Sequence, residues 1–135
     1  MSSLPTPKIE ITTDTAAFWE ASTVGRLHLP RCNGCGLVIW YPRPMCPDCH
    51  GTDLTWFDST GLGSVYSFTV VRKGQGAWAE HAPYVVAFVE LDDGPRIATN
   101  IVDCDPDTVT VGMPVRVVFD AAGDSAAVPR FAPLS

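Results

Sequence analysis

Residues 31–51 read RCNGCGLVIWYPRPMCPDCHG and contain four of the five cysteines of the chain. The cysteines form two Cys-x-x-Cys pairs, Cys32 with Cys35 and Cys46 with Cys49, and ten residues separate the pairs. One pair of thiolates binds a metal ion from one side, and a second pair completes a tetrahedron. The spacing therefore predicts a structural Zn²⁺ site with four protein ligands and no open coordination position.

The residues around the cysteines suit a zinc ribbon with rubredoxin-like knuckles. Glycines within and after the first pair fit a tight turn whose backbone N–H groups point toward the sulfurs, and Pro47 and Asp48 suit the second turn. The apolar segment 37–41 predicts a short strand between the knuckles, which Pro42 and Pro44 end.

Alternatives to a zinc site remain open at this point. The thiols could form two disulfides, although no secretory signal indicates an oxidising compartment. The same thiolates could hold iron or an iron–sulfur cluster. His50 adjoins the last cysteine, but four thiolates already fill a tetrahedral shell, so we interpret it as a solvated neighbour.

The composition indicates one folded domain with a small appendage. The chain has 135 residues, of which 46% are hydrophobic, and its twelve Pro and eleven Gly indicate many turns and short strands. No apolar run approaches the roughly 18–20 residues that span a bilayer. The N-terminus lacks the charged and apolar segments of a secretory signal. We therefore expect no membrane contact and a cytoplasmic location.

The charge argues against a nucleic-acid-binding protein. A zinc ribbon beside a β-barrel is a common combination in such proteins, and their phosphate-binding surface needs a basic face. Here nine Lys and Arg are scattered among fifteen Asp and Glu, which gives a net charge of −6 and a pI near 4.8. We therefore expect no nucleic acid partner, although a local basic patch stays open.

The sequence before the first cysteine predicts an N-terminal arm followed by a short helix. Residues 1–12 read as a polar arm with two prolines. A helix over residues 15–23 is expected to begin at an N-cap on Thr13 or Asp14, and Gly25 is placed to end it in a left-handed conformation. So short a helix is marginal alone and must dock on another element.

Phe18 and Trp19 are the large apolar side chains of that helix. Adjacent helical positions point about 100° apart, so both rings cannot enter one narrow groove equally. We expect one of them to meet a partner protein; the alternative is that both fill the local core.

The second half of the chain predicts a small barrel of the OB type. A strand at 54–57 begins this half, and Asp92-Asp93-Gly94-Pro95 is a hairpin turn. Five strands are expected, at residues 64–72, 84–91, 96–102, 115–120 and 128–131. They predict a mainly β protein with a five-stranded barrel, and an open β-sandwich is the alternative. The predicted division is 1–30 for the arm, helix and lead-in strand, 31–52 for the zinc ribbon, and 53–135 for the barrel.

Alternation along the strands predicts two apolar faces. Residues 85, 87, 89 and 91 form one row, and Tyr84 and Phe88 belong to the other. Tyr66 and Phe68 share a face by the same parity. A small barrel has one interior, so the second face needs a cover, either the helix and ribbon or a partner protein.

The loop 73–83 is the longest irregular segment of the barrel half. It holds glycines, Trp78 and a histidine, which are typical of a binding loop and equally of a mobile one. Arg72 and Lys73 at its start are the best local cation pair for an anionic ligand, although such pairs are usually solvated strand ends. Cys104 has acidic neighbours and is interpreted as inert.

No catalytic residues are predicted. The sequence contains no Gly-x-Ser-x-Gly, P-loop or Gly-x-Gly-x-x-Gly motif, and its three histidines are dispersed. A closed four-cysteine site cannot activate water. The sequence therefore favours a binding or assembly subunit over an enzyme.

Several segments together resemble the DUF35 family, whose members combine an N-terminal helix, a rubredoxin-like zinc ribbon and an OB-fold. Each segment alone is weakly diagnostic, but the resemblance covers nearly the whole chain. The segments are Phe18–Glu20, Gly25–Leu27, Cys32–Cys49 with Tyr41–Pro44, Gly61–Val70, Pro83–Leu91 and Val111–Val115.

The resemblance implies an accessory subunit that accompanies a thiolase-like enzyme. Described partners of the family are acetoacetyl-CoA thiolase, an acetyltransferase acting on phloroglucinols, and thiolase-like aldolases that shorten steroid side chains. In the aldolase systems the domain is separate or fused to a MaoC-type hydratase. The partner carries the catalytic residues, and the DUF35 chain helps to form the acyl-CoA site.

The favoured function is therefore a non-catalytic subunit of a steroid side-chain aldolase complex. Arg72, Lys73 and Trp78 are the expected acyl-CoA contacts on this chain. The expected partner interface consists of Phe18, Trp19, Tyr66, Phe68, Tyr84 and Phe88. The alternatives are a subunit of a thiolase or acetyltransferase complex, a nucleic-acid-binding protein, and a self-sufficient hydrolase or transferase.

Overall fold

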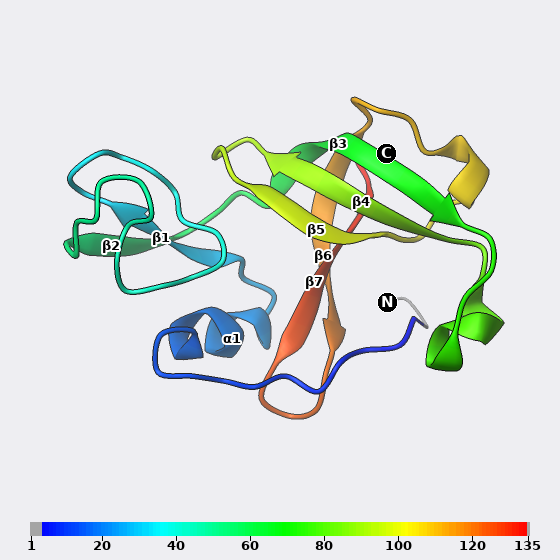
Figure 1. Cartoon of the computed structure of the whole chain (residues 1–135), viewed down its shortest axis with the longest axis horizontal. Coiled ribbons are helices and arrows are strands. Elements are labelled where there is room, and N and C mark those ends of the chain that lie inside the picture. Colours follow the sequence, from blue (N-terminus) through cyan, green and yellow to red (C-terminus); the bar gives the residue numbers. More distant parts are fainter. Residues whose placement is uncertain (1–3, 135) are drawn as a thin grey trace.

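The computed structural model describes residues 4–134, so residues 1–3 of the predicted arm and Ser135 lie outside the described residues. One α-helix, seven strands and two 3₁₀ helices follow one another along these residues (Figure 1). They are α1 (Ala16–Ser22), β1 (His28–Cys32), β2 (Leu54–Asp58), β3 (Leu62–Val71), η1 (Gly76–His81), β4 (Tyr84–Leu91), β5 (Arg96–Ile101), η2 (Pro106–Thr108), β6 (Pro114–Ala121) and β7 (Ala127–Pro133).

Five strands close into a barrel in the order β3-β4-β5-β7-β6, which confirms the predicted OB-type fold and excludes the open sandwich. The hairpin turn at residues 92–95 joins β4 to β5 as predicted, with Glu90 opposite Arg96. The apolar row Val85, Ala87, Val89 and Leu91 is buried inside the barrel. Strict alternation on β4 thus supplies one wall of the core.

A β-bulge in β3 corrects the predicted faces of that strand. The pairing of β3 with β4 shifts between Val65 and Ser67, so one extra residue enters β3 there. Before the bulge Val65 faces the core, and after it Phe68 lies opposite Ala87 and packs on the core. Because side chains alternate with a period of two, one inserted residue exchanges the two faces. Tyr66 is therefore exposed while Phe68 turns inward, and the two do not share a face.

Helix α1 begins one or two residues later than predicted. Its N-cap is Thr15, not Thr13 or Asp14, and the Thr15 side chain accepts a hydrogen bond from the Thr12 N–H at 3.1 Å. Gly25 follows the helix with a φ of 79°, which confirms the predicted left-handed residue.

Both aromatic side chains of α1 are buried, which corrects their assignment to a partner interface. Phe18 is 0% exposed and lies edge-on to Trp19, Trp40 and Tyr41 at centroid distances of 4.7, 5.4 and 5.9 Å. Trp19 Nε1 donates a hydrogen bond of 2.7 Å to the Tyr41 hydroxyl. The alternative that both rings fill the local core is the one the structure supports.

The ribbon is a separate two-stranded sheet beside the barrel. β2 pairs with β1, from His28 opposite Asp58 to Cys32 opposite Leu54, and does not join the barrel half that the sequence assigned it to. The expected strand at 37–41 is reduced to a single bridge between Val38 and Arg31. The long loop between the knuckles is thus held by few strand hydrogen bonds.

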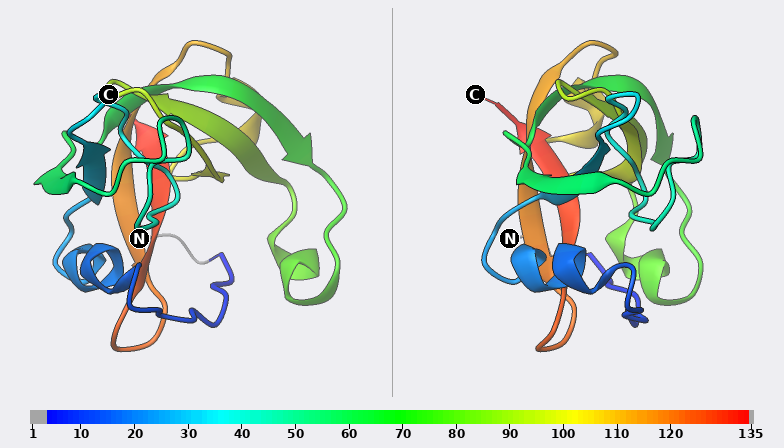
Figure 2. Two further views of the ribbon diagram at one scale, coloured as in Figure 1. Left: turned by 60° about the vertical axis from the view of Figure 1, so that its left-hand side comes forward. Right: turned by 90° about the vertical axis from the view of Figure 1, so that its left-hand side faces the viewer.

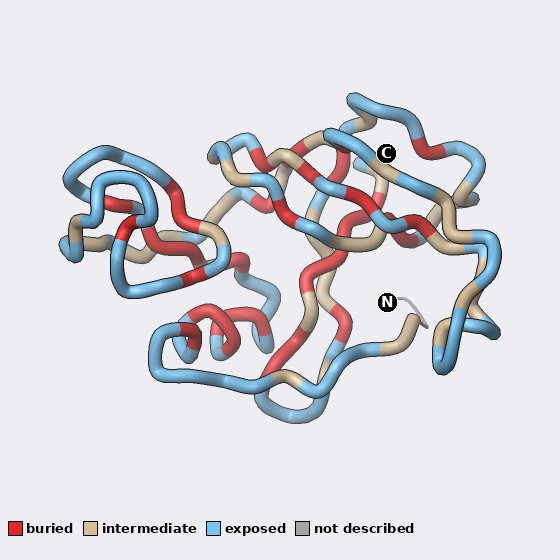
Figure 3. Tube along the Cα trace, viewed as in Figure 1, coloured by how far each residue is buried: buried red, intermediate tan, exposed pale blue. Residues whose placement is uncertain are grey.

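Helix α1 lies between the ribbon and the barrel. It contacts both β1 and β7, and two further views show it at the foot of the β6–β7 hairpin (Figure 2). The Ala127 N–H of β7 donates to the Ser22 hydroxyl at 3.0 Å. Buried residues run from the ribbon through α1 into the barrel strands (Figure 3), so the two parts share one core.

The burial of Phe18 gives the first prediction. Phe18→Ala removes a fully buried ring from the contact between helix and ribbon, and we expect it to lower the free energy of unfolding by about 3–5 kcal/mol. Phe88→Ala is the matched control, because that ring is half exposed, and it should change the value by less than about 1 kcal/mol. Urea unfolding of the zinc-loaded protein measures both, and equal losses would contradict this packing.

Candidate functional site

The four cysteine sulfurs come together in one cluster, in which all lie within 4.8 Å of one another. Cys32 Sγ is 3.5 Å from Cys49 Sγ, and Cys35 Sγ is 3.6 Å from Cys46 Sγ. Zn–S bonds of about 2.3 Å place the sulfurs of a tetrahedron roughly 3.8 Å apart, so the cluster fits Zn²⁺ closely. All four cysteines are free thiols, which excludes the two-disulfide alternative.

Both knuckles are closed by backbone hydrogen bonds. The Gly36 N–H donates to the Cys32 carbonyl at 2.8 Å, and the His50 N–H donates to the Cys46 carbonyl at 3.0 Å. A Cβ added at Gly51 would lie 3.3 Å from Cys49 Sγ, so the glycine leaves room for the sulfur. His50 is exposed and is not part of the cluster, as expected for a solvated neighbour.

The surroundings of the thiols give Cys46 and Cys35 different pKa values. The N–H groups of Cys49 and Asp48 lower the pKa of Cys46 to about 7, although burial opposes them. The N–H of Leu37 acts to lower the pKa of Cys35. Hydrogen bonds between the Cys35 thiol and the other thiols nevertheless raise that pKa to about 12. A metal ion must displace these protons, so zinc affinity falls as the pH is lowered.

The exposed outer side of β3, β4 and the start of β5 forms a second candidate site, which we call the barrel face and define as Tyr66, Val86, Phe88 and Arg96. Tyr66, Val86 and Phe88 are 48%, 41% and 49% exposed. The Arg96 guanidinium lies 3.8 Å from the centroid of the Tyr66 ring, and its Nε donates to Glu90 at 3.0 Å. A shallow hollow of about 240 Å³ lies beside Val86 and Phe88.

The structure thus separates the residues that the sequence grouped into one interface. Tyr66 and Phe88 are on the barrel face, while Phe68 packs on the core. Tyr84 is half-buried, with its ring 4.7 Å from that of Trp78. Sequence reasoning missed Arg96, although the hairpin turn that places it opposite Glu90 was a usable signal.

The predicted acyl-CoA contacts lie on or beside one loop, and Arg72 and Trp78 have different neighbours. Arg72 pairs with Asp107 at 2.5 Å on the surface, and Lys73 next to it is exposed. Trp78 lies in η1 against Tyr84. A Cβ at Gly74 would collide with the Trp78 carbonyl, so the loop is folded back on itself.

The only histidine–carboxylate ion pair recorded within residues 4–134 joins His28 and Asp58. His28 Nδ1 is 2.7 Å from Asp58 Oδ1, and the His28 ring stacks on Trp56 with centroids 5.4 Å apart. The hydrogen bond from His28, and then Arg26, lower the pKa of Asp58. A carboxylate with a lowered pKa is a weak base, which fits a structural link between β1 and β2.

No helix in the described part of the chain is long and apolar enough to cross a membrane.

Comparison with known proteins matches both parts of this architecture. Residues 19–55 match the ChsH2 rubredoxin-like zinc ribbon domain, and residues 56–120 match the ChsH2 C-terminal OB-fold domain. The solved structure "Ltp2-ChsH2(DUF35) aldolase" has a TM-score of 0.79 and 37% identity, covering 93% of this chain and 98% of that one.

Two curated relatives cover different shares of their own length. A "DUF35 domain-containing scaffold protein" of Methanothermobacter thermautotrophicus is 39% identical over 79% of this chain and 82% of its own. A "Probable enoyl-CoA hydratase alpha subunit" of Thermomonospora curvata is 37% identical over 94% of this chain, which spans only 40% of that relative.

A closed barrel joined to a four-cysteine ribbon defines a zinc-ribbon/OB-fold protein. Within that class, the chain belongs to the ChsH2 (DUF35) family, and its four cysteines are the zinc site of the ribbon.

The metal site gives the second prediction. Elemental analysis of protein purified without chelator should find one Zn²⁺ per chain, and Cys46→Ser should reduce this to nearly none and destabilise the ribbon. Cys104→Ser is the control, since Cys104 lies outside the cluster, and it should keep the full zinc content. Iron in place of zinc, or no metal in the unaltered protein, would contradict the assignment.

Proposed function

We propose that this chain is a non-catalytic accessory subunit that binds a thiolase-like acyl-CoA enzyme and helps to form its acyl-CoA site. The favoured case is an aldolase that shortens steroid side chains. The observation that carries the proposal is the barrel face, an exposed aromatic surface on a chain with a closed metal site. Membership of the ChsH2 (DUF35) family supports it, because a close structural relative is named as an aldolase assembly.

The barrel face has the chemistry of a protein interface. Tyr66 and Phe88 leave large apolar surfaces in water, at a cost of about 25 cal/mol per Å². Tyr and Arg are enriched among residues that dominate binding energies, and the stacked Tyr66–Arg96 pair offers both. Glu90 holds Arg96 in place, so part of the surface is ordered before binding.

The rest of the chain supports a subunit without its own chemistry. The zinc site has four protein ligands and therefore no position for water or substrate. The His28–Asp58 pair is braced by Arg26 and is part of the ribbon sheet. We infer that the reacting groups belong to the partner.

The acyl-CoA site is proposed to be shared with the partner. Arg72, Lys73 and Trp78 are the proposed contacts for the nucleotide end of the ligand. Asp107 already neutralises Arg72 in the free chain, which weakens the attraction of this loop for phosphate groups. A complete site thus needs further groups from the partner.

A nucleic-acid-binding role is the second candidate. Exposed aromatic residues with an arginine on the outside of an OB-fold resemble a stacking platform for single-stranded bases. The net charge of −6 disfavours it, because phosphate contacts dominate such binding. Strong binding to DNA or RNA that weakens steeply with salt would favour this candidate over the accessory subunit.

The third prediction concerns the interface. Phe88→Ala, co-expressed with the thiolase-like protein of the same cell, should weaken the complex by roughly 2 kcal/mol or more, about 30-fold in Kd. Val24→Ala removes an exposed apolar side chain at the end of α1 and should leave the Kd unchanged. Size exclusion and calorimetry measure the effect. A complex unaffected by Phe88→Ala would place the interface elsewhere.

The fourth prediction concerns the ligand. Titration of coenzyme A into this chain alone should give weak or no heat, whereas the complex with the partner should bind it. Lys73→Ala should then raise the Kd of the complex several-fold, because one cation near the phosphates is lost. Tight binding of coenzyme A by the isolated chain would refute a site completed by the partner.

A further inference from the structure

One buried arginine joins three segments that are distant in the sequence. Arg130 on β7 is 2% exposed, and its Nη1 donates to Asp120 Oδ2 on β6 at 2.5 Å. Its two terminal nitrogens also donate to the carbonyls of Leu4 and Pro5, at 3.3 and 2.5 Å. The Trp78 ring of η1 lies 6.0 Å from the guanidinium. The arm, the β6–β7 hairpin and the η1 loop therefore meet at Arg130.

The charge balance around Arg130 favours backbone carbonyl groups as its further hydrogen-bond acceptors. Asp120 compensates the positive charge of Arg130 within the protein. The N–H groups that face the arm therefore suit neutral carbonyl oxygens better than a second anion. Proline at position 5 has no N–H and favours an extended chain, so the arm presents its carbonyls to the guanidinium.

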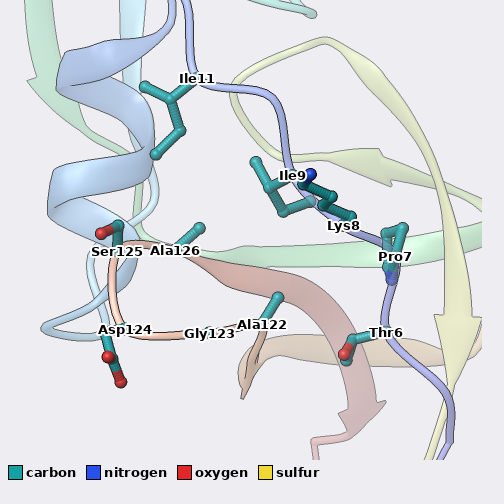
Figure 4. A pocket seen from close by; sticks show the side chains of 10 residues that line it. All are labelled: Thr6, Pro7, Lys8, Ile9, Ile11, Ala122, Gly123, Asp124, Ser125 and Ala126. Carbon is teal, nitrogen blue, oxygen red and sulfur yellow. The ribbon is translucent and has the colours of Figure 1, made fainter.

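The arm is partly buried at Leu4 and Pro5 and again at Ile9, and it is exposed between them. Leu4 and Pro5 are half-buried at Arg130, and Ile9 packs on the core, while residues 6–8 are exposed. A cleft of about 480 Å³ lies between residues of the arm and the turn 122–126 of the β6–β7 hairpin. Figure 4 shows the side chains that line it. The arm thus crosses this side of the barrel as a strap with a gap beneath it.

Trp78 lies between Arg130 and the rest of its loop. Its ring packs on Tyr84 with centroids 4.7 Å apart, and its backbone carbonyl abuts Gly74. A shift of the guanidinium away from Trp78 would remove a cation from the face of this ring. Within the loop, η1 is a 3₁₀ helix without a side-chain cap, and hydrogen bonds in such helices have poorer geometry than in an α-helix.

We propose that Arg130 is a positioning residue that fastens the N-terminal arm as a strap and, through Trp78, holds the η1 loop in place. Its bearing on acyl-CoA binding rests on the proposed function of that loop. The strap itself does not depend on the proposed function, since it is built from contacts within this chain.

The test measures hydrogen exchange in the free, zinc-loaded chain. Removal of residues 1–8 takes away the strap but leaves the Arg130–Asp120 pair, and Arg130→Lys keeps the charge but loses the forked donors. Both variants should raise exchange of the η1 amides, residues 76–81, by roughly fivefold or more. Exchange of β4 and the zinc content should stay as in the unaltered protein.

Two matched controls separate this effect from general loosening. Arg96→Lys alters an exposed arginine–carboxylate pair on the barrel face, and Lys8→Ala alters the loose part of the arm. Neither should change exchange at η1. Unchanged η1 exchange after removal of residues 1–8 would overturn the proposal. A rise in η1 exchange without any change in acyl-CoA binding by the complex would support the strap and refute the proposed ligand role of the loop.

Discussion

The packing of Phe18 against Trp40 and Tyr41 is the contact on which the arrangement of the two parts depends. Both ribbon aromatics lie on the long loop between the knuckles, where a single β-bridge joins Val38 to Arg31. The zinc site at the two ends of the loop and the helix that packs on it therefore hold the loop in its conformation. Helix α1 is in turn fixed to the barrel through Ser22 and Ala127. The zinc site, the helix and the barrel therefore stabilise one another, and we expect loss of zinc to destabilise the core.

This dependence supports placing the proposed functional surface on the barrel. The metal is enclosed by protein ligands, and the aromatic side chains of α1 are used to join ribbon and barrel. The outer side of β3 and β4 has no such cover within the described residues and retains Tyr66 and Phe88 in solvent. In the proposed accessory subunit, the zinc-held ribbon and the closed barrel form a rigid body, and the barrel face is the proposed contact surface for the partner.

The sequence predicted the features that depend on local pattern. The cysteine spacing gave the zinc site, and the alternation from Tyr84 to Leu91 gave the strand and its buried row. It failed where one residue changes the geometry, because the bulge after Val65 leaves no sequence signal and places Tyr66 and Phe68 on opposite faces of the strand. The Arg130–Asp120 pair was also missed, since only the pairing of β6 with β7 brings the two together. The burial of both Phe18 and Trp19 follows from the ribbon loop that covers α1, which periodicity alone does not reveal.

The measurement that tests the proposed interface most directly is hydroxyl-radical footprinting of the chain, free and in complex with the proposed thiolase-like partner. Oxidation of a side chain reports its exposure, and both Tyr66 and Phe88 are half exposed in the free chain. The account predicts that the partner strongly protects these two residues, while Met45 on the ribbon, also exposed, remains as reactive as before. Protection of Met45 with Tyr66 and Phe88 left reactive would contradict the barrel face as the interface.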